Sequence, residues 1–333
     1  MKHIIMVNPI SGKKKGYKHA QIIQKLLKKN NIDSEIITSE YAGQLREIAY
    51  EISHKYDTRF YSVGGDGTLN EIVSGIIDTN SDIVVLPCGT GNDFSKHVNK
   101  YFSLRKIINL SINKKSSKFD VIKLNDNRYC INILNAGFDA LVAYNIKYFR
   151  WIPFISGKAV YNLSIIFTLF NNKNYKIRIR TNNFAEKSKY TLIAISNGKY
   201  YGGGIVPSSR ACADDGKLSI CKIYSTSILK KIRFLPQYKR GEHEDLDPVY
   251  INDDITYVSL VSNHKFPLSI DGEVTLTKRI RGKILKNAVN IVKIDDKNSS
   301  FKEPFFYSSI SSSSISTSSL LFNSGYSTTS LIL

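Results

Sequence analysis

The chain has 333 residues, 42% of them hydrophobic and 23% charged, a composition typical of a soluble globular protein with enough apolar material for a core. This length suggests about two domains. The formal net charge of +19 favours an anionic partner: a nucleic acid, a phosphorylated small molecule or an anionic membrane surface. A lysine-rich solvated surface would give the same charge.

The four cysteines, Cys88, Cys130, Cys212 and Cys221, form no CxxC pair. This spacing argues against a zinc site or a disulfide framework and favours reduced thiols. The opening MKHIIMVNPISG is typical of a first strand rather than of a signal peptide. The most apolar later stretch, residues 160–170, is too short to span a bilayer. We therefore expect a cytoplasmic protein, peripheral at the inner membrane surface.

Strand and helix signals alternate through residues 1–120. Ile22, Ile23, Leu26 and Leu27, for example, recur on one face of a predicted helix. This βαβα order predicts a parallel, doubly wound α/β domain that binds ligands at the carboxyl ends of its strands. The predicted strands are 3–7, 34–38, 59–63 and 82–87, and the predicted helices are 17–29, 42–53 and one from Leu69.

From about Lys118 the segments become short and alternating, with many β-branched and aromatic residues between Asn, Asp and Gly turns. This pattern predicts an antiparallel β-sandwich or barrel over residues 121–295, whose final segment returns to the first domain. One helical stretch, residues 140–170, interrupts it. Residues 296–333 form a serine-rich, low-complexity tail, for which disorder is the expectation. The predicted strands are 118–124, 128–138, 176–181, 190–198, 217–224, 255–262, 266–273 and 290–294.

The stretch YSVGGDGTLNEI, residues 61–72, places three glycines around Asp66, after a strand and before a helix. Such a loop presents backbone N–H groups and a helix N-terminus to an anion, which predicts a phosphate site. It is neither a dinucleotide fingerprint nor a Walker A loop. A tight turn that needs positive φ is the plainer interpretation, but one glycine would suffice for that.

Asp66 would be repelled by a polyphosphate unless a cation lay between them, and Mg²⁺ is the natural bridge. The alternative is an Asx-turn residue that caps the loop. Thr68 could cap the following helix or donate to a phosphate oxygen.

A second loop, PCGTGNDFSK, follows the fourth predicted strand with Gly89, Thr90 and Gly91. Taken alone it is ordinary turn chemistry. Together with NPISG (residues 8–12) after the first strand, however, three strand ends would line one crevice.

These motifs, with NAGFDA, NGKYYGGGIVPSSRACADDGKL and SIDGE, resemble the diacylglycerol kinase catalytic-domain family, which includes bacterial lipid kinases and the sphingosine and ceramide kinases. The resemblance covers about residues 2–294. It implies an α/β nucleotide domain followed by a β-sandwich domain, with ATP between them. The residues that match the family's ATP contacts are Asn8, Pro9, Ser11, Gly12, Thr38, Gly64, Gly65, Asp66, Gly67, Thr68, Asn70 and Thr90.

The resemblance also assigns chemical roles. The family's catalytic motif corresponds to Asp271, Gly272 and Glu273, with Asp271 the favoured general base and Glu273 the alternative. Asp66 could hold Mg²⁺ or orient water nearby. Asp215 matches an aspartate that holds a structural Mg²⁺ with the carbonyls of Cys212 and Lys217. Without the resemblance, SIDGEV would predict a type I′ hairpin turn, and both interpretations can hold together.

Two further segments are open to more than one interpretation. The loop YYGGGIVPSSRA, residues 200–211, could shape the acceptor site, pack on the nucleotide domain or lie mobile at the surface. The segment of residues 143–158 mixes Tyr144, Tyr148, Phe149, Trp151 and Phe154 with basic residues, which suits a membrane–water interface. A helix packed on the sandwich is the alternative. Cys88 stands where the family usually has a small residue.

The sequence thus predicts an ATP- and Mg²⁺-dependent lipid kinase that converts diacylglycerol to phosphatidate at an anionic phospholipid surface. Its rivals are a kinase for another lipid alcohol (a sphingoid base or ceramide), an NAD kinase, a nucleic-acid-binding module and a non-enzymatic lipid-binding protein. The basic residues are dispersed and no nucleic-acid-binding motif occurs, so we expect no nucleic-acid partner. A homodimer is left open.

Overall fold

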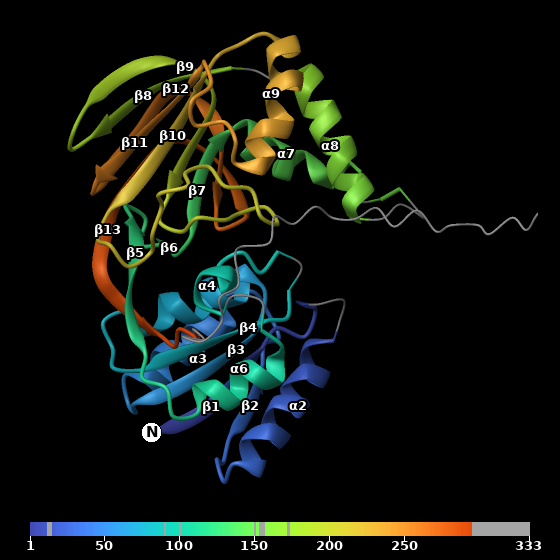
Figure 1. Ribbon diagram of the computed structural model, residues 1–333, viewed down its shortest axis with the longest axis vertical. Coiled ribbons are helices and arrows are strands. Elements are labelled where there is room, and N and C mark those ends of the chain that lie inside the picture. Colours follow the sequence, from blue (N-terminus) through green and yellow to red (C-terminus); the bar gives the residue numbers. More distant parts are fainter. Residues whose placement is uncertain are drawn as a thin grey trace, which may run out of the picture. The chain divides into compact units, whose positions relative to one another are not determined.

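The N-terminal part of the chain forms a parallel sheet. The computed structural model describes residues 1–11, 15–89, 91–99, 102–149, 151–152, 157–171 and 174–294. The first four strands lie in the order β4-β3-β1-β2, and every neighbouring pair is parallel. They are β1 (Lys2–Val7), β2 (Glu35–Thr38), β3 (Thr58–Gly64) and β4 (Asp82–Pro87) (Figure 1).

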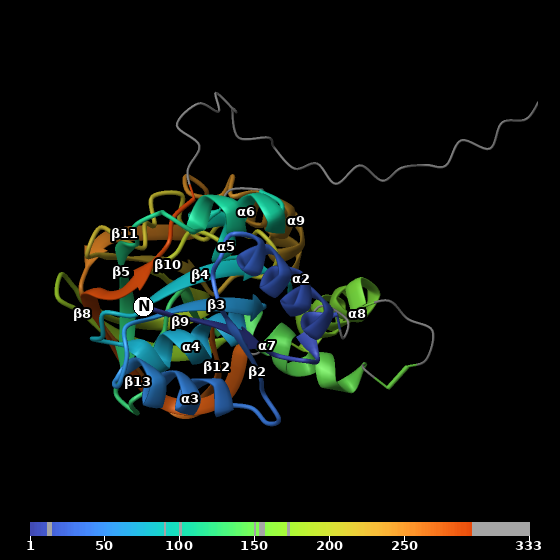
Figure 2. The ribbon, with the colours of Figure 1, turned by 90° about the horizontal axis from the view of Figure 1, so that it is seen from below.

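Helices cover both faces of this sheet, because successive side chains of each strand point to opposite sides. In β1, Ile4 and Met6 pack with α3 and α4, whereas Ile5 and Val7 pack with α2 and α6. Figure 2 shows these two layers on either side of the strands. The helices of this part are α2 (Gly16–Lys29), α3 (Gln44–Ser53), α4 (Asp66–Ile76), α5 (Ser95–Val98) and α6 (Leu104–Ser111).

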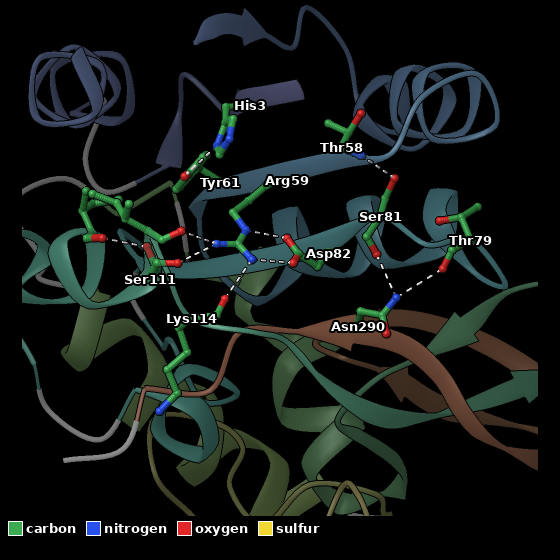
Figure 3. A network of polar contacts seen from close by, with 12 residues as sticks. His3, Thr58, Arg59, Tyr61, Thr79, Ser81, Asp82, Ser111, Lys114 and Asn290 are labelled. Atoms are coloured by element: carbon green, nitrogen blue, oxygen red, sulfur yellow. Dashed lines mark hydrogen bonds and ion pairs between the residues drawn. The ribbon is translucent and has the colours of Figure 1, made fainter. Parts of the chain in front are cut away.

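A buried ion pair joins β3, β4 and the end of α6, away from the carboxyl ends of the strands. The Arg59 guanidinium donates to both carboxylate oxygens of Asp82, with Nε–Oδ1 and Nη2–Oδ2 distances of 2.8 and 2.7 Å. It also donates to the carbonyl oxygens of Ser111, Ile112 and Lys114 at the end of α6 (Figure 3). The guanidinium therefore satisfies carbonyls that the end of a helix leaves without partners.

The remaining strands pair in antiparallel fashion with one another around a second apolar core. A further apolar cluster lies where α7, α8 and α9 cover β7, β9, β10 and β11. The strands are β5 (Ser117–Leu124), β6 (Tyr129–Cys130), β7 (Ile133–Gly137), β8 (Tyr175–Thr181), β9 (Ala185–Ser196), β10 (Leu218–Tyr224), β11 (Val249–Ile255), β12 (Tyr257–Ile270) and β13 (Glu273–Ile291). The helices are α7 (Phe138–Asn145), η1 (Ile146–Tyr148), α8 (Gly157–Asn171) and α9 (Ile228–Arg240).

The long strand β13 connects the parallel and the antiparallel parts of one continuous sheet. Its first part forms a hairpin with β12, and its last residues, Asn290 and Ile291, pair in parallel with Asp82 and Ile83 of β4. The chain therefore returns to the N-terminal sheet after it has completed the antiparallel part.

The predicted fold class, a doubly wound α/β domain followed by an antiparallel β-sandwich, is confirmed. Several elements differ from the sequence expectation. Helix α4 begins at Asp66 rather than Leu69, and the single helix expected over 140–170 is divided into α7, η1 and α8. The two strands expected over residues 255–262 and 266–273 are largely one strand, β12. The elements α5, α6, α9 and β11 were not expected. The domain boundaries at residues 120 and 295 stay predictions.

Candidate functional site

The carboxyl ends of β2, β1, β3 and β4 meet along one edge of the sheet. Val7 is in register with both Thr38 and Val63, and Gly64 is in register with Pro87. Strand β2 lies on one side of β1, and β3 and β4 lie on its other side, so the order of the strands reverses between β1 and β3. Open α/β sheets bind ligands at such a point. The predicted phosphate loops follow these two strands and the neighbouring β4.

The turn after β1 is held by its own polar groups. Ser11 donates from its backbone N–H and its hydroxyl to the carbonyl of Asn8, and the Asn8 side chain accepts the N–H of Ile10. Gly16, the first residue of α2, lies so near the Asn8 carbonyl that a Cβ there would be 2.6 Å from the oxygen. The described part of NPISG therefore forms a compact turn at the sheet edge, and Pro9 is part of it.

The two glycine loops touch each other through bare backbone. A Cβ on Gly89 would overlap the Cα of Gly65, and a Cβ on Gly64 would overlap the side chain of Thr68. Thr68 is a buried residue inside α4, so it does not cap that helix, whose N-cap is Gly65. At Gly67, by contrast, an added Cβ would meet nothing within 4 Å. Packing thus requires glycine at position 64 of the first loop and at position 89 of the second, whereas Gly67 is free to face a ligand.

Asp66 holds the second loop in place. Its carboxylate accepts the backbone N–H groups of Asp93 and Phe94 at 3.2 and 3.0 Å. Burial raises the pKa of Asp66, these two hydrogen bonds lower it, and the Asp93 charge raises it, with a net shift upward. The carboxylate therefore bridges the two loops, and the hydrogen bonds found for it do not form an Asx turn in its own loop.

Asp93 is a site residue that the sequence analysis treated only as turn chemistry. The residue is 4% exposed, and its carboxylate binds the Lys96 ammonium at 2.6 Å and accepts the backbone N–H of Gly203 at 2.9 Å. Gly203 belongs to the glycine-rich loop after β9, whose Lys199 donates its N–H to the His97 ring at 2.8 Å. Burial and the neighbouring Lys199 charge lower the pKa of His97 to about 4. The loop of residues 199–205 therefore packs on the second glycine loop, as one of its three interpretations expected.

Asp271 and Gly272 form the two-residue turn between β12 and β13. Ile270 pairs with Glu273, and the φ angles of Asp271 and Gly272 are 47° and 95°. Positive φ at both central positions is the signature of a type I′ turn, so the hairpin expectation is confirmed. The turn directs the Asp271 side chain toward the N-terminal part of the chain.

Five donors converge on the carboxylate of Asp271, from segments far apart in the sequence. Three are the consecutive backbone N–H groups of residues 131–133, which lead from β6 into β7, at 2.8–3.0 Å. Such a run of amides forms an anion-binding nest. The other two are the Cys130 thiol at 3.2 Å and the Asn70 side-chain amide at 2.6 Å. Burial raises the pKa of Asp271 while the hydrogen bonds lower it, and the net shift is upward.

Asn70 connects this carboxylate to the first glycine loop. It lies one turn into α4 and donates from the same amide nitrogen to the Tyr129 carbonyl at 3.0 Å. Glu273, the alternative base, begins β13 with an exposed side chain. The structure thus brings Gly64–Asn70, Asp93 and Asp271 into one hydrogen-bonded chain of contacts.

The predicted metal residues Cys212, Asp215 and Lys217 lie on the exposed turn before β10. One Asp215 oxygen accepts the Lys217 N–H at 2.9 Å. Burial raises the pKa of Asp215, this hydrogen bond lowers it and the charges of Asp120 and Asp214 raise it, with a net shift upward. A cation would relieve that repulsion, which suits Mg²⁺. Within the described ranges, no three histidine, cysteine or acidic side chains gather to hold a metal. A site built from one carboxylate and backbone carbonyls stays a prediction.

Three of the predicted residues are not covered: Gly12, Thr90 and Phe154 lie outside the described residues, as does the tail. None of the helices that the structure describes combines the length and apolar character that crossing a bilayer requires.

A cavity of about 310 Å³ lies between α9 and the strands beneath it. Most of its wall is apolar, and two carboxyl groups line it, those of Asp139 and Asp247. Asp139 accepts a hydrogen bond from the Tyr201 hydroxyl, which is itself 2.9 Å from the Tyr238 hydroxyl. Burial raises the pKa of Asp139 to about 6, against the lowering effect of the two tyrosines. Tyr201 comes from the same loop as Gly203, so this polar cluster adjoins the loop that binds Asp93.

Comparison with known families gives two matches in succession along the chain. The family described as "Diacylglycerol kinase catalytic domain" matches residues 2–124. The family described as "YegS C-terminal NAD kinase beta sandwich-like domain" matches residues 132–293. Together they account for both parts of the fold described above.

Individual proteins agree with these families. A "Putative lipid kinase" of Staphylococcus carnosus (strain TM300) is 27% identical over 307 residues, covering 88% of this chain and 96% of that protein. A relative from Staphylococcus aureus (strain MSSA476), also named as a "Putative lipid kinase", is 28% identical over 271 residues, covering 78% of this chain and 86% of its own length.

A crystal structure titled as a diacylglycerol kinase of Bacillus anthracis has the same fold. It superposes with a TM-score of 0.66 and 19% identity, covering 88% of this chain and 97% of that one.

Proposed function

Because the chain belongs to the diacylglycerol kinase catalytic-domain family, we propose that it is an ATP-dependent lipid kinase and that its acceptor is diacylglycerol. The reaction transfers the γ-phosphoryl group of ATP to the free hydroxyl and yields phosphatidate and ADP. The family and the names of the relatives support lipid phosphorylation, and the choice of diacylglycerol is our own.

The observation that carries the proposal is the contact of Asp271 with Asn70. The hairpin turn of the sandwich delivers a carboxylate to the helix that begins at the first glycine loop, 2.6 Å from an amide of that helix. Phosphoryl transfer needs a positioned phosphate and a group that accepts the hydroxyl proton. The glycine loops and the start of α4 suit the phosphates, and Asp271 suits the proton.

As the base, Asp271 would take the proton of the lipid hydroxyl. The hydroxyl oxygen would form a bond to the γ-phosphorus of ATP while the bond from that phosphorus to the bridging oxygen breaks and ADP leaves. A carboxylate offers about four acceptor positions, and five donors already occupy Asp271. The hydroxyl would therefore replace one of them. The Asn70 amide is a side chain that can turn away, whereas the three backbone amides are fixed by β6 and β7.

Asp66 would act by position in this scheme. Its carboxylate keeps the second glycine loop against the first. If the glycine loops bind the ATP phosphates, Asp66 would also lie near the Mg²⁺ that accompanies them. Bound Mg²⁺ would neutralise phosphate charge. A structural Mg²⁺ at Asp215 would join the loop to β10 and take no part in the chemistry.

The test is transfer of labelled γ-phosphate from ATP to a panel of lipid alcohols in mixed detergent micelles, with wild type and Asp271→Asn compared. Labelled phosphatidate from wild type alone would support the proposal. Label on a sphingoid base or ceramide would correct the acceptor and keep the reaction. Labelled NADP from NAD, with no labelled lipid, would replace the lipid kinase by an NAD kinase, a fold relationship that the sandwich family's description names.

A further inference from the structure

The outward faces of two neighbouring helices are apolar. On α8 the exposed side chains include Ile166, Phe167 and Phe170, the last of them 70% exposed. On α9 they include Ile228, Leu229 and Ile232, with Leu229 80% exposed. Spacings of one, three and four residues put each trio on one side of its helix. Monomeric proteins rarely leave contiguous apolar surface of this kind without a use.

Aromatic residues before α8 extend this surface. Trp151 is 77% exposed, and its indole N–H donates to the Tyr148 carbonyl at 2.8 Å. The rings of Tyr148 and Phe149 both contact the ring of Phe167, with centroids 6.2 and 5.6 Å apart. We call the surface formed by Tyr148, Trp151, Ile166, Phe167, Phe170, Ile228, Leu229 and Ile232 the α8–α9 face.

The two helices are neighbours in the fold. Residues of both contribute to the apolar cluster under them, among them Ile165 and Leu169 of α8 and Phe234 of α9. Figure 1 shows α8 and α9 side by side, next to α7, on the side of the strands that they cover. Their inner faces line the cavity, so the α8–α9 face is what remains outside.

The helices that form this face carry only basic charges. Helices η1, α8 and α9 contain no aspartate or glutamate. The α9 sequence carries exposed Lys230, Arg233, Lys239 and Arg240, and Lys147 of η1 lies over the Tyr144 ring at 3.6 Å. The segment after α9 carries four acidic residues, Glu242, Glu244, Asp245 and Asp247. Asp247 and Glu242 pair with Lys230 and Arg240, and the Glu244 carboxylate accepts the Ser209 N–H. The helices of the face themselves carry only positive charge, which is the complement of an anionic surface.

We propose that the α8–α9 face docks on an anionic phospholipid bilayer, with its apolar side chains among the headgroups and its lysines and arginines against lipid phosphates. A basic rim around aromatic and aliphatic side chains is the pattern of an interfacial helix pair. The net charge of +19 acts in the same direction. This inference rests on the proposed lipid substrate, because an enzyme for a bilayer lipid must reach the bilayer.

Trp151 makes the proposal directly testable, because it is the chain's single tryptophan and belongs to the face. The full chain would be titrated without ATP with vesicles of phosphatidylcholine alone or with 30% phosphatidylglycerol. We expect a blue shift of tryptophan fluorescence and co-sedimentation with the anionic vesicles only. Because phosphate contacts are screened, 0.5 M salt should weaken the binding.

The decisive variant is Leu229→Asp with Ile232→Asp, which replaces two exposed apolar side chains by charges that anionic lipid repels. We expect the lipid concentration for half-maximal binding to rise by tenfold or more. Leu110→Asp is the matched control, because Leu110 is 41% exposed on α6 of the other part of the chain. It should bind vesicles like wild type. Circular dichroism spectra that coincide with that of wild type would show that both variants are folded.

Equal vesicle binding by the double variant and wild type would overturn the proposal. A second outcome would also overturn it: wild type forms a dimer in sedimentation, and the folded double variant loses that dimer but still binds vesicles. The face would then bind a second copy of the chain. Failure of the proposed kinase function looks different: vesicle binding persists, in wild type and Asp271→Asn alike, while no lipid is labelled. Conversely, a double variant that labels lipid in detergent micelles but not in vesicles supports both proposals.

Discussion

The Asp271 carboxylate lies 2.6 Å from the Asn70 amide, although 201 positions separate the two residues in the sequence. One belongs to a hairpin turn of the sandwich and the other to the helix behind the first glycine loop. The contact makes the two parts of the chain contribute to one site. Its chemical meaning depends on whether Asp271 accepts a proton.

Replacing Asp271 by asparagine should lower kcat by about 10²–10⁴, the usual contribution of a general base. The measurement is label transfer to lipid at saturating ATP and lipid. Glu273→Gln is the matched control, because it neutralises the exposed carboxylate of the same turn. If the glutamine variant loses the activity and the asparagine variant keeps it, Glu273 is the base.

The pH dependence follows from the environment of Asp271. A base works in its charged form, and burial of this carboxylate raises its pKa above 3.8. Activity should therefore fall with decreasing pH at values higher than an ordinary aspartate would give. The acid limb of kcat/KM between pH 4 and 8 measures it, with circular dichroism at each pH to show that the protein stays folded. A flat profile down to pH 4 would contradict an ionising Asp271.

Two glycine substitutions separate packing from phosphate binding. Gly89→Ala should lower the free energy of unfolding by about 1–3 kcal/mol, since its Cβ would overlap the Gly65 backbone. Gly67→Ala should not lower stability and should raise it by up to about 1 kcal/mol, because its Cβ meets nothing within 4 Å and the residue lies in α4. It should nevertheless weaken ATP binding if the phosphates approach this backbone. Urea unfolding and calorimetric titration with ATP give the two quantities. Unchanged ATP affinity in Gly67→Ala would argue against phosphate at that position.

Asp139 should make stability depend on pH in the sense opposite to most carboxylates. Burial raises its folded-state pKa to about 6, so between pH 4 and 6 the native state keeps a proton that the unfolded chain has lost. Stability should fall as pH rises through this range, by up to about 3 kcal/mol, and then level off. Asp139→Asn should remove this part of the decline. The free energy of unfolding in urea, measured from pH 4 to 8 for both proteins, tests it; parallel curves would show that Asp139 titrates normally.

The buried ion pair offers a test of stability alone. Asp82→Asn should cost about 3–5 kcal/mol, because it leaves the Arg59 guanidinium buried without its counter-charge. Asp126→Asn breaks an exposed pair with Arg128 and should cost about 0–1 kcal/mol. Urea unfolding of both variants compares them. Equal losses would mean that the burial of the Arg59–Asp82 pair makes no energetic difference.

Strands β1, β3 and β4 were predictable because both of their faces are largely buried, so each appears in the sequence as a short apolar run beside turn residues. The two glycine loops at the strand ends were predictable from their composition, and their binding of phosphate stays a prediction. Strand β11 was not expected, since VYINDDI carries two aspartates and lies at the end of the strand order. Helix α9 was missed because Pro236 lies inside it and its outward side is apolar.

The partners of the site residues were the least predictable part. That Asp66 would bind the amides of residues 93 and 94 depends on the pairing of β3 with β4. The five donors to Asp271 come from α4 and from the β6–β7 segment. No local sequence pattern could predict that these segments would contact an Asp-Gly turn. For Asp93, the sequence feature that could have predicted a role in the site was its position directly after the second glycine loop.

The return of β13 to the first sheet has a consequence during synthesis on the ribosome. The edge of β4 receives its neighbour only when Asn290 and Ile291 have been made, after nearly all of the described chain. Until then the nascent sheet exposes an unpaired strand edge beside apolar residues that Ala288 and Val289 will cover. Folding of the N-terminal half is thus completed by the last strand, and a ribosome that stalls before residue 288 leaves an aggregation-prone intermediate.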